Sequence, residues 1–155
     1  PKLMEASKED AKEHRNLSKI VKDSMDRHAP LLEAQGLHQS ATITDDVHMQ
    51  TEKGMMERLM DHLLSNARAY AGPDATVHVE LKDNPVTLVV EDDGEGMDET
   101  TREHAFDLSK EARDIKQGSG IGLSIVKDIV ETHGGTINVE SAPGEGTRIE
   151  VRFPS

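Results

Sequence analysis

Residues 118–127 read "GSGIGLSIVK": three glycines stand at every second position, and an apolar run that ends in a lysine follows. Glycine costs backbone entropy, so Gly118, Gly120 and Gly122 indicate unusual dihedral angles or a main chain that another group approaches closely. A helix that starts directly after such a loop presents free N–H groups and partial positive charge, which favour a phosphate. The alternative is a flexible loop that joins two elements.

Composition limits the classes of protein to which the chain can belong. Its 155 residues suit one domain, which is long enough to bury a sizeable core. A net charge of −12 argues against a surface built for nucleic acid phosphates. The absence of cysteine excludes disulfides and thiolate metal sites, and no apolar run approaches the roughly 20 residues of a membrane span. We expect a cytoplasmic domain that contacts neither nucleic acid nor membrane, whatever anchors its parent protein.

The first residues differ in character from the rest. The sequence begins at Pro1 rather than at a methionine, so we expect it to be a piece of a longer protein. Residues 1–16 are charged and have few apolar anchors, which is typical of a linker or of a frayed helix that belongs to a preceding element. The domain itself is expected to comprise residues 17–155.

Hydrophobic periodicity predicts an alternation of helices and strands. Helices are expected over residues 17–36, about 52–70, about 98–105 and 123–133. Strands are expected over residues 38–44, 47–50, 75–81, 86–92, 136–141 and 147–153. The last four strands are expected to form two antiparallel hairpins. Because helices and strands are interleaved, the expected fold is an α/β (α+β) two-layer sandwich, with helices on one face of a mixed sheet.

The glycine motif differs from two common phosphate-binding loops. A P-loop needs Lys and then Ser or Thr directly after its last glycine, whereas Leu123 and Ser124 follow Gly122. The dinucleotide fingerprint has another spacing, and it follows directly on a strand. Neither fold is therefore expected.

A second glycine pair lies in "EDDGEGM", residues 91–97, where Asp92 stands two residues before Gly94 and four before Gly96. A carboxylate at the end of a buried strand can accept a hydrogen bond from an exocyclic amine, and the glycines allow a flat ring to approach. The alternative is an ordinary Asp-Gly turn.

Asn66 lies in the middle of the second expected helix, although asparagine is a poor helix former. Its amide oxygen is a hard ligand of the kind that Mg²⁺ prefers. The alternative is an asparagine that is solvated or hydrogen-bonded in the core.

Together these segments resemble a known family. "LLSNARAY" (63–70), "EDDGEGM" (91–97), "AFDL" (105–108), "GSGIGLSIV" (118–126) and "GEGTRIEVRFP" (144–154) occur in the order of its N, G1, F and G2 boxes and closing strand. The sequence resembles the catalytic, ATP-binding domain of two-component sensor histidine kinases, within the gyrase, chaperone, histidine kinase and MutL superfamily. The resemblance covers about residues 17–154, and it implies a Bergerat fold with a mobile ATP lid.

The resemblance implies roles for individual residues. Asn66 would coordinate a Mg²⁺ ion that bridges the ATP phosphates, with Tyr70 near the nucleotide. Asp92 would accept a hydrogen bond from the adenine amino group, while Gly94 and Gly96 let the ring approach.

The rest of the implied nucleotide site lies in the lid, over about residues 100–117, or beside it. Its members are Phe106, Lys110, Lys116, Gly118, Gly120, Gly122, Leu123 and Thr147. Phe106 would be the aromatic of the F box, the three glycines the hinge and phosphate cradle, and Thr147 would lie near the adenine. Lys110 and Lys116 are candidates for phosphate contacts, with a solvated lid of mixed charge as the alternative.

The chain departs from the family pattern near Asn66. One helical turn earlier the kinases commonly carry another asparagine and the hydrolysing relatives a catalytic glutamate, but this chain has His62. His62 is a candidate to bond a water or a phosphate; an exposed or structural histidine is the alternative. Without the glutamate, the usual general base for attack by water is missing, which argues against a gyrase-like ATPase. Three residues after the position of Asn66 the kinases often carry a lysine, but this chain has Ala69 there, with Arg68 beside it.

The resemblance implies that the chain binds Mg-ATP and transfers the γ-phosphoryl to a histidine on a helical-hairpin dimerisation domain outside this sequence. A response regulator receiver domain would then accept it. His28, in "HAPLL", lacks the acidic neighbour of a phospho-accepting histidine and is not expected to be one. Two other readings stay open: a serine kinase of the anti-sigma-factor type, and a nucleotide-gated interaction module without catalytic activity.

Overall fold

The computed structural model describes residues 13–103 and 119–154, with only the backbone for residue 101 and residues 119–122. Its helices are α2 (Leu17–Ala34), α3 (Met55–Tyr70), α4 (Glu99–Glu103) and α6 (Ser119–Thr132). Its strands are β1 (Glu13–Asn16), β2 (His38–Ile43), β3 (His48–Thr51), β4 (Thr76–Lys82), β5 (Thr87–Asp92), β6 (Thr136–Ser141) and β7 (Thr147–Arg152).

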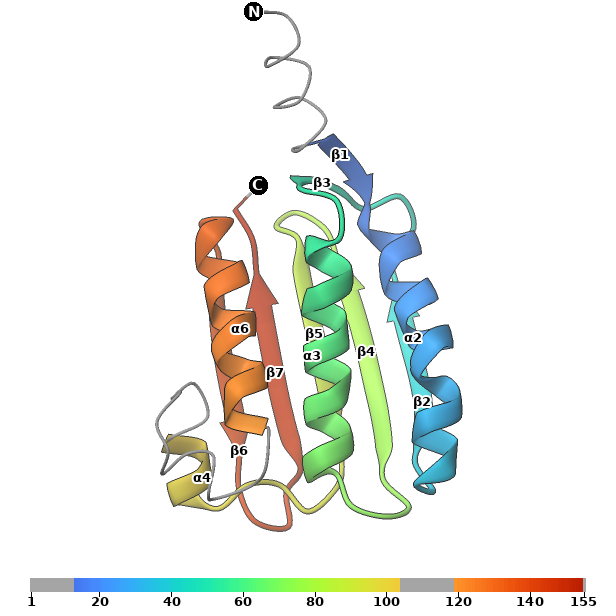
Figure 1. The fold of residues 1–155 in the computed structure, drawn as a ribbon, viewed down its shortest axis with the longest axis vertical. Coiled ribbons are helices and arrows are strands. Elements are labelled where there is room, and N and C mark those ends of the chain that lie inside the picture. The colour runs from blue at the N-terminus through green and yellow to red at the C-terminus, as the bar shows by residue number, and fades with distance from the viewer. Residues whose placement is uncertain (1–12, 104–118, 155) are drawn as a thin grey trace, which may run out of the picture.

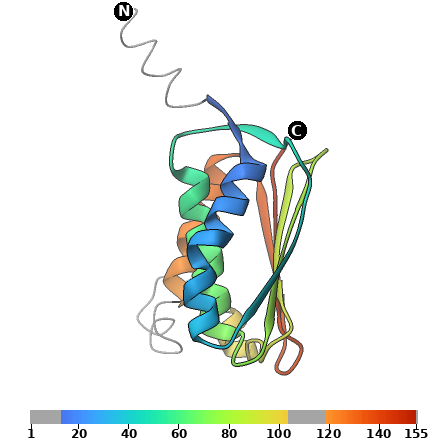
Figure 2. The same cartoon turned by 90° about the vertical axis from the view of Figure 1, so that its right-hand side faces the viewer.

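Five strands form one mixed sheet in the order β2-β4-β5-β7-β6 (Figure 1). β2 runs parallel to β4, and every other neighbouring pair is antiparallel. The helices α2, α3 and α6 lie side by side on one face of this sheet (Figures 1 and 2). The expected two-layer sandwich and both expected hairpins, β4–β5 and β6–β7, are confirmed.

Local sequence explains the bounds of α2. The Asn16 side chain accepts a hydrogen bond from the Lys19 backbone N–H at 3.0 Å and so caps the first turn. At the other end Gly36 adopts φ +78°, a left-handed conformation that suits glycine and ends the helix.

Residues 13–16 differ from the charged linker or frayed helix that their composition suggested. They form β1, which pairs antiparallel with β3 in a separate two-stranded sheet. The pairing is tertiary: the partner strand lies more than thirty residues away, and the Arg15 side chain donates a hydrogen bond to the Thr51 carbonyl at 3.0 Å. Composition alone contains no information about such a distant partner.

The long helices begin at other residues than expected. α3 starts after Gly54, whose φ is +87°, instead of near residue 52. α6 starts at Ser119, four residues before the expected Leu123, so Gly120 and Gly122 lie inside its first turns. Glycine disfavours helix interiors by about 1 kcal/mol, which made a loop the simpler expectation. Packing of the later turns against α3 and the sheet, with Leu123 and Val126 fully buried, favours the helix instead.

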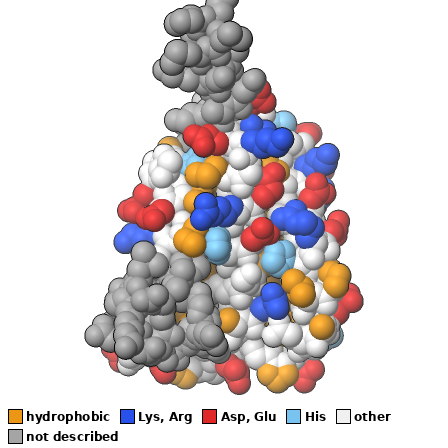
Figure 3. Space-filling model, in the orientation of Figure 1, with side chains coloured by type: hydrophobic (Ala, Val, Ile, Leu, Met, Phe, Trp, Pro, Cys, Tyr) orange, Lys and Arg blue, Asp and Glu red, His pale blue; other side chains and the backbone are white. Residues whose placement is uncertain are grey.

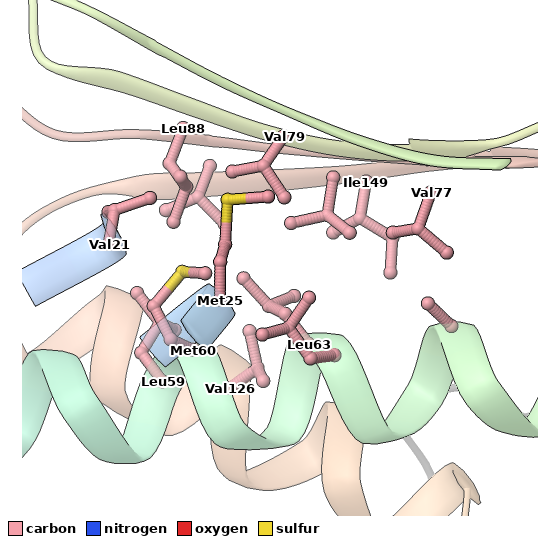
Figure 4. Packing of buried hydrophobic residues seen from close by; sticks show 14 of the residues in the cluster. Val21, Met25, Leu59, Met60, Leu63, Val77, Val79, Leu88, Val126 and Ile149 are labelled. Carbon is pink, nitrogen blue, oxygen red and sulfur yellow. The ribbon is translucent and has the colours of Figure 1, made fainter. Parts of the chain in front are cut away.

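The core lies between the helices and the sheet (Figure 4). β4 and β7 alternate buried and partly exposed residues, so each presents one apolar face to the helices. Met60 and Leu63 of α3 meet Val79 and Ile149 of the sheet across this layer, and all four are at most 2% exposed. No helix in the described part of the chain has the length and hydropathy needed to cross a bilayer.

One end of the molecule collects several chain segments. The C-terminal end of α3, the N-terminal end of α6, the end of β5 and the start of β7 all lie at the lower end in Figure 1, opposite β1. Acidic and basic side chains are interspersed on the helix-bearing face (Figure 3), so this face has no extended basic patch among its described residues.

Candidate nucleotide site

Asn66 is a buried polar residue with an unsatisfied acceptor. It lies in the buried stripe of α3, between Leu63 and Ala67, and only 3% of it is exposed. Its Oδ1 atom is buried and has no hydrogen-bond partner within the described part of the chain. A buried amide oxygen without a partner costs roughly 1 to 3 kcal/mol, which a bound cation or donor would offset.

Tyr70 follows Asn66 by one helical turn and therefore lies on the same face of α3. It is 5% exposed and belongs to the hydrophobic core, at the end of the helix where the segments named above meet. The structure thus brings these two predicted residues together.

Asp92 is the last residue of β5, and its side chain is on the helix side of the sheet. Leu88 and Val90 precede it on that face, and Asp92 itself is 6% exposed. Its Oδ1 accepts a hydrogen bond from the Gly94 backbone N–H at 3.0 Å. Burial raises the pKa of this carboxyl, against hydrogen bonds from the backbone N–H groups of Gly94 and Thr147 that lower it. Such a carboxylate is held in a fixed direction and retains lone pairs for a further donor.

Asp93 has a different environment from that of its neighbour. It is exposed, and its Oδ1 accepts a hydrogen bond from the Thr76 backbone N–H at 2.7 Å. The two adjacent carboxylates therefore separate into one at the candidate site and one that ties the loop to the start of β4.

Gly94 and Gly96 are required by the backbone of their own loop. A Cβ at Gly94 would lie 1.8 Å from the Ala71 carbonyl oxygen, and one at Gly96 would lie 2.2 Å from that of Ala142. Gly96 also has a φ of +72°. These contacts let the loop after β5 pack closely on the end of α3 and on the β6–β7 turn, a reason that the sequence did not show.

Thr147 lies directly opposite Asp92 in the register of β5 and β7, on the same inner face. It is 3% exposed, and its Oγ1 lies 2.8 Å from the Oγ of Ser141, its partner on β6. Ser141 was not predicted as a site residue. The sequence pointed to Ser141 only through the predicted hairpin of residues 136–141 and 147–153. In that hairpin Ser141, the last residue of the first strand, lies opposite Thr147, the first residue of the second.

His62 and Leu123 lie in unlike surroundings. His62 is half-buried on α3, where burial and the Arg58 charge lower the pKa of its imidazole, against the opposing charge of Asp61. Leu123 is fully buried in the hydrophobic core, so its side chain serves packing. Arg68, next to Ala69, donates from Nε to the Gln35 side chain at 2.7 Å.

The remaining predicted site residues are not described in full. Phe106, Lys110, Lys116 and Gly118 lie outside the described residues, and Gly120 and Gly122 are described only as backbone of α6. Among the described residues, no group of three or more His, Asp or Glu side chains converges to hold a metal ion. A hard cation at Asn66 would need most of its oxygen ligands from a bound molecule and water.

Known proteins resemble this chain in sequence and in fold. Residues 51–155 match the family model described as "Histidine kinase-, DNA gyrase B-, and HSP90-like ATPase". The alginate biosynthesis sensor protein KinB of Pseudomonas aeruginosa is 29% identical over 142 residues, which are 90% of this chain and 24% of that protein. The sensor histidine kinase TmoS of Ectopseudomonas mendocina is 35% identical over 133 residues, 77% of this chain and 14% of that protein. The chain thus spans a quarter or less of the length of these relatives.

Solved structures share the fold. The mycobacterial sensor histidine kinase MprB has a TM-score of 0.75 at 25% identity, over 92% of this chain and 97% of that chain. A nucleotide-free form of the catalytic domain of the histidine kinase ThkA has a TM-score of 0.77 at 18% identity, over 92% and 96%. The second likeness concerns the fold alone. The family model covers more than half of the sequence, and the chain therefore belongs to the histidine kinase-, DNA gyrase B- and HSP90-like ATPases, with sensor histidine kinases among its relatives.

Proposed function

We propose that the chain binds Mg-ATP between α3, α6 and the inner end of the sheet, as the cytoplasmic catalytic domain of a histidine kinase, whatever anchors its parent protein. It would donate the γ-phosphoryl to a histidine on a helical-hairpin dimerisation domain, from which a response regulator receiver domain takes it. The observation that carries this proposal is the buried, unpaired Oδ1 of Asn66 at the same end of the molecule as the buried Asp92 carboxylate.

Asp92 binds the base in this proposal. A carboxylate only accepts hydrogen bonds, so it suits the amino group of adenine and is mismatched with the O6 acceptor of guanine. The backbone hydrogen bonds to Asp92 fix its direction before a nucleotide arrives. Tyr70, Gly94, Gly96 and Thr147 would surround the base.

Asn66 holds the metal in this proposal, through its Oδ1. Mg²⁺ supplies charge neutralisation of the phosphates when it is bound, and phosphoryl transfer depends mainly on such neutralisation and on positioning. The first turn of α6 has N–H groups without partners in the helix, and these favour phosphate oxygens at the same end. Gly118, Gly120, Gly122, Phe106, Lys110 and Lys116 would complete the phosphate side and the lid.

Transfer to a histidine is favoured over hydrolysis. No carboxylate occupies the position one turn before Asn66, where the hydrolysing relatives carry their general base; His62 lies there with a lowered pKa. His62 would bond a water or a phosphate. The relatives named above are sensor proteins of the histidine kinase type, which favours a histidine over a serine acceptor.

The adenine assignment is tested by calorimetry with two adjacent variants. We expect Asp92→Ala to abolish measurable ATP binding, because it removes the carboxylate that accepts a hydrogen bond from the amino group. Asp93→Ala is the matched control: it removes a carboxylate that faces Thr76 and should leave most of the affinity. The wild-type chain should bind ATP far more tightly than GTP, since a buried acceptor is left unsatisfied by O6. Equal losses in both variants, or equal binding of GTP, would contradict the assignment.

A further inference from the structure

We infer that Ser141 is a positioning residue that sets the direction of the Thr147 hydroxyl and thereby helps the site to select a base with an amino group. This inference rests on the nucleotide site proposed above. Asp92, Thr147 and Ser141 lie side by side in the register of β5, β7 and β6. They form a row of side chains at the end of the sheet, on the face that the helices cover.

The hydrogen bonds of Ser141 use every donor and acceptor of its hydroxyl. Its Oγ accepts from the Met97 backbone N–H at 2.7 Å and donates to the Gly146 carbonyl at 2.9 Å. It also lies 2.8 Å from Thr147 Oγ1, a distance that does not by itself identify the donor. A carbonyl oxygen can only accept, so the single Ser141 proton is committed to Gly146.

The contact between the two hydroxyls must then use the proton of Thr147. Ser141 has one remaining lone pair, and it accepts from Thr147 Oγ1 through that lone pair. Thr147 consequently keeps only lone pairs for any other partner. The Asp92 carboxylate beside it on β5 is also an acceptor, so this row presents two acceptors and no side-chain donor.

Two adjacent acceptors distinguish bases at the 6 position of a purine. An amino group has two hydrogens to offer, whereas the O6 atom of hypoxanthine faces both acceptors with lone pairs of its own. Ser141 also joins the loop after β5, through Met97, to the β6–β7 turn, through Gly146. Ser141 therefore connects these two segments, and it also fixes the direction of the Thr147 O–H group.

The test compares ATP with ITP. At position 6 of the purine ATP has an amino group and ITP has an oxygen, and ITP also has a proton on N1. In Ser141→Ala the Thr147 hydroxyl is free to rotate and to donate to O6. We expect the preference for ATP, measured by calorimetry as the ratio of the two dissociation constants, to fall about three- to tenfold, the range of one ordinary hydrogen bond. A merely structural role would weaken both nucleotides equally and leave the ratio unchanged.

Three further variants make the result specific. Thr147→Val should lower the same ratio, and Ser141→Ala should add nothing in that background, because the two residues act as one unit. Ser40→Ala is the control: Ser40 also has a side-chain hydrogen bond, 2.6 Å from His78 on the outer face of the sheet, and its loss should leave the ratio intact. If Ser141→Ala gives no thermal unfolding transition, Ser141→Cys, with a thiol of similar size that is a weak donor, replaces it.

The outcomes separate this inference from the proposed function. A wild-type chain that fails to bind ATP would overturn both. A wild-type chain that prefers ATP, together with an unchanged ratio in the Ser141 variant or an additive effect in the Thr147→Val background, would overturn the role of Ser141 alone.

Discussion

Asn66 has a buried side-chain oxygen without a hydrogen-bond partner among the described residues. Asn66→Ala removes an oxygen that is buried without a partner, so the substitution should cost the nucleotide-free protein little stability. Mg²⁺-dependent ATP binding should weaken by about 1 to 3 kcal/mol, or roughly 5- to 150-fold, the range for losing a hydrogen bond to a charged group. Calorimetry with and without Mg²⁺ measures this, and thermal unfolding checks the fold.

The exposed Asn138 of β6 offers a matched control for that experiment. Asn138→Ala removes the same amide from the outer face of the sheet and should leave the Mg²⁺ dependence unaltered. An Asn66→Ala variant with the Mg²⁺ dependence of the wild type would show that Asn66 is a structural residue.

The raised pKa of Asp92 predicts opposite pH dependences for stability and for binding. Burial favours the protonated form in the folded state, so the contribution of Asp92 to stability is fully present below the unfolded pKa. It is lost as the pH rises from the ordinary value of 3.8 through the raised folded pKa. ATP needs the ionised carboxylate, so affinity should increase over the same window.

Thermal unfolding of the free chain and calorimetric titration with ATP measure the two slopes. Asp92→Asn is the reference, because it removes this titration and leaves the other carboxyls in place. Subtracting its unfolding free energies should leave a stability difference that declines with rising pH. A difference that is flat or that increases would show that burial does not raise this pKa.

At the scale of elements, sequence patterns predicted most of the fold because they are local. Apolar periodicity located α2 and α3 and the strands β4 and β5, and the turn residues between the strands indicated both hairpins. The order of the sequence motifs identified Asn66 and Asp92 as candidate site residues, but only the structure shows that the elements carrying them meet at one end of the molecule.

The failures also have a physical pattern. β1 exists through its pairing with β3, and the first turns of α6 exist despite two glycines because the following turns pack in the core. Ser141 was not predicted because its hydrogen-bond partners lie in two other segments, Met97 in the loop after β5, and Gly146 and Thr147 where β7 begins. Each of these cases involves a contact between residues far apart in the sequence, such as the hydrogen bond from Met97 to Ser141, which a local pattern does not encode.

At the scale of the whole molecule, the candidate site and the ends of the described chain are far apart. The site lies at the lower end in Figure 1, whereas β1 and the end of β7 lie at the upper end. In the proposed transfer, the acceptor histidine would approach the lower end from outside the described fold. This arrangement agrees with a separate acceptor domain that presents its histidine to the nucleotide.

His28, the histidine followed by "APLL", lies in surroundings that do not suit a phosphoryl acceptor. His28 is 9% exposed on α2, its Nε2 lies 3.0 Å from an Asp61 oxygen, and its Nδ1 is buried. Arg27 binds the same carboxylate at 2.9 Å. One ring nitrogen is thus buried, and the other is occupied by the Asp61 carboxylate.

We therefore expect the chain alone to bind ATP and yet to remain unlabelled by γ-labelled ATP. Addition of a histidine-bearing hairpin domain from the same kinase should produce an acid-labile label on that domain, and Asp92→Ala should abolish it because the nucleotide no longer binds. Rapid stoichiometric labelling of the chain at His28 would contradict the proposal. An acid-stable label on a serine of a partner would instead favour a serine kinase, and ATP binding without any transfer would favour a nucleotide-gated module. The chemistry of the label thus distinguishes acceptors that the nucleotide site itself, built from Asn66 and Asp92, would serve equally well.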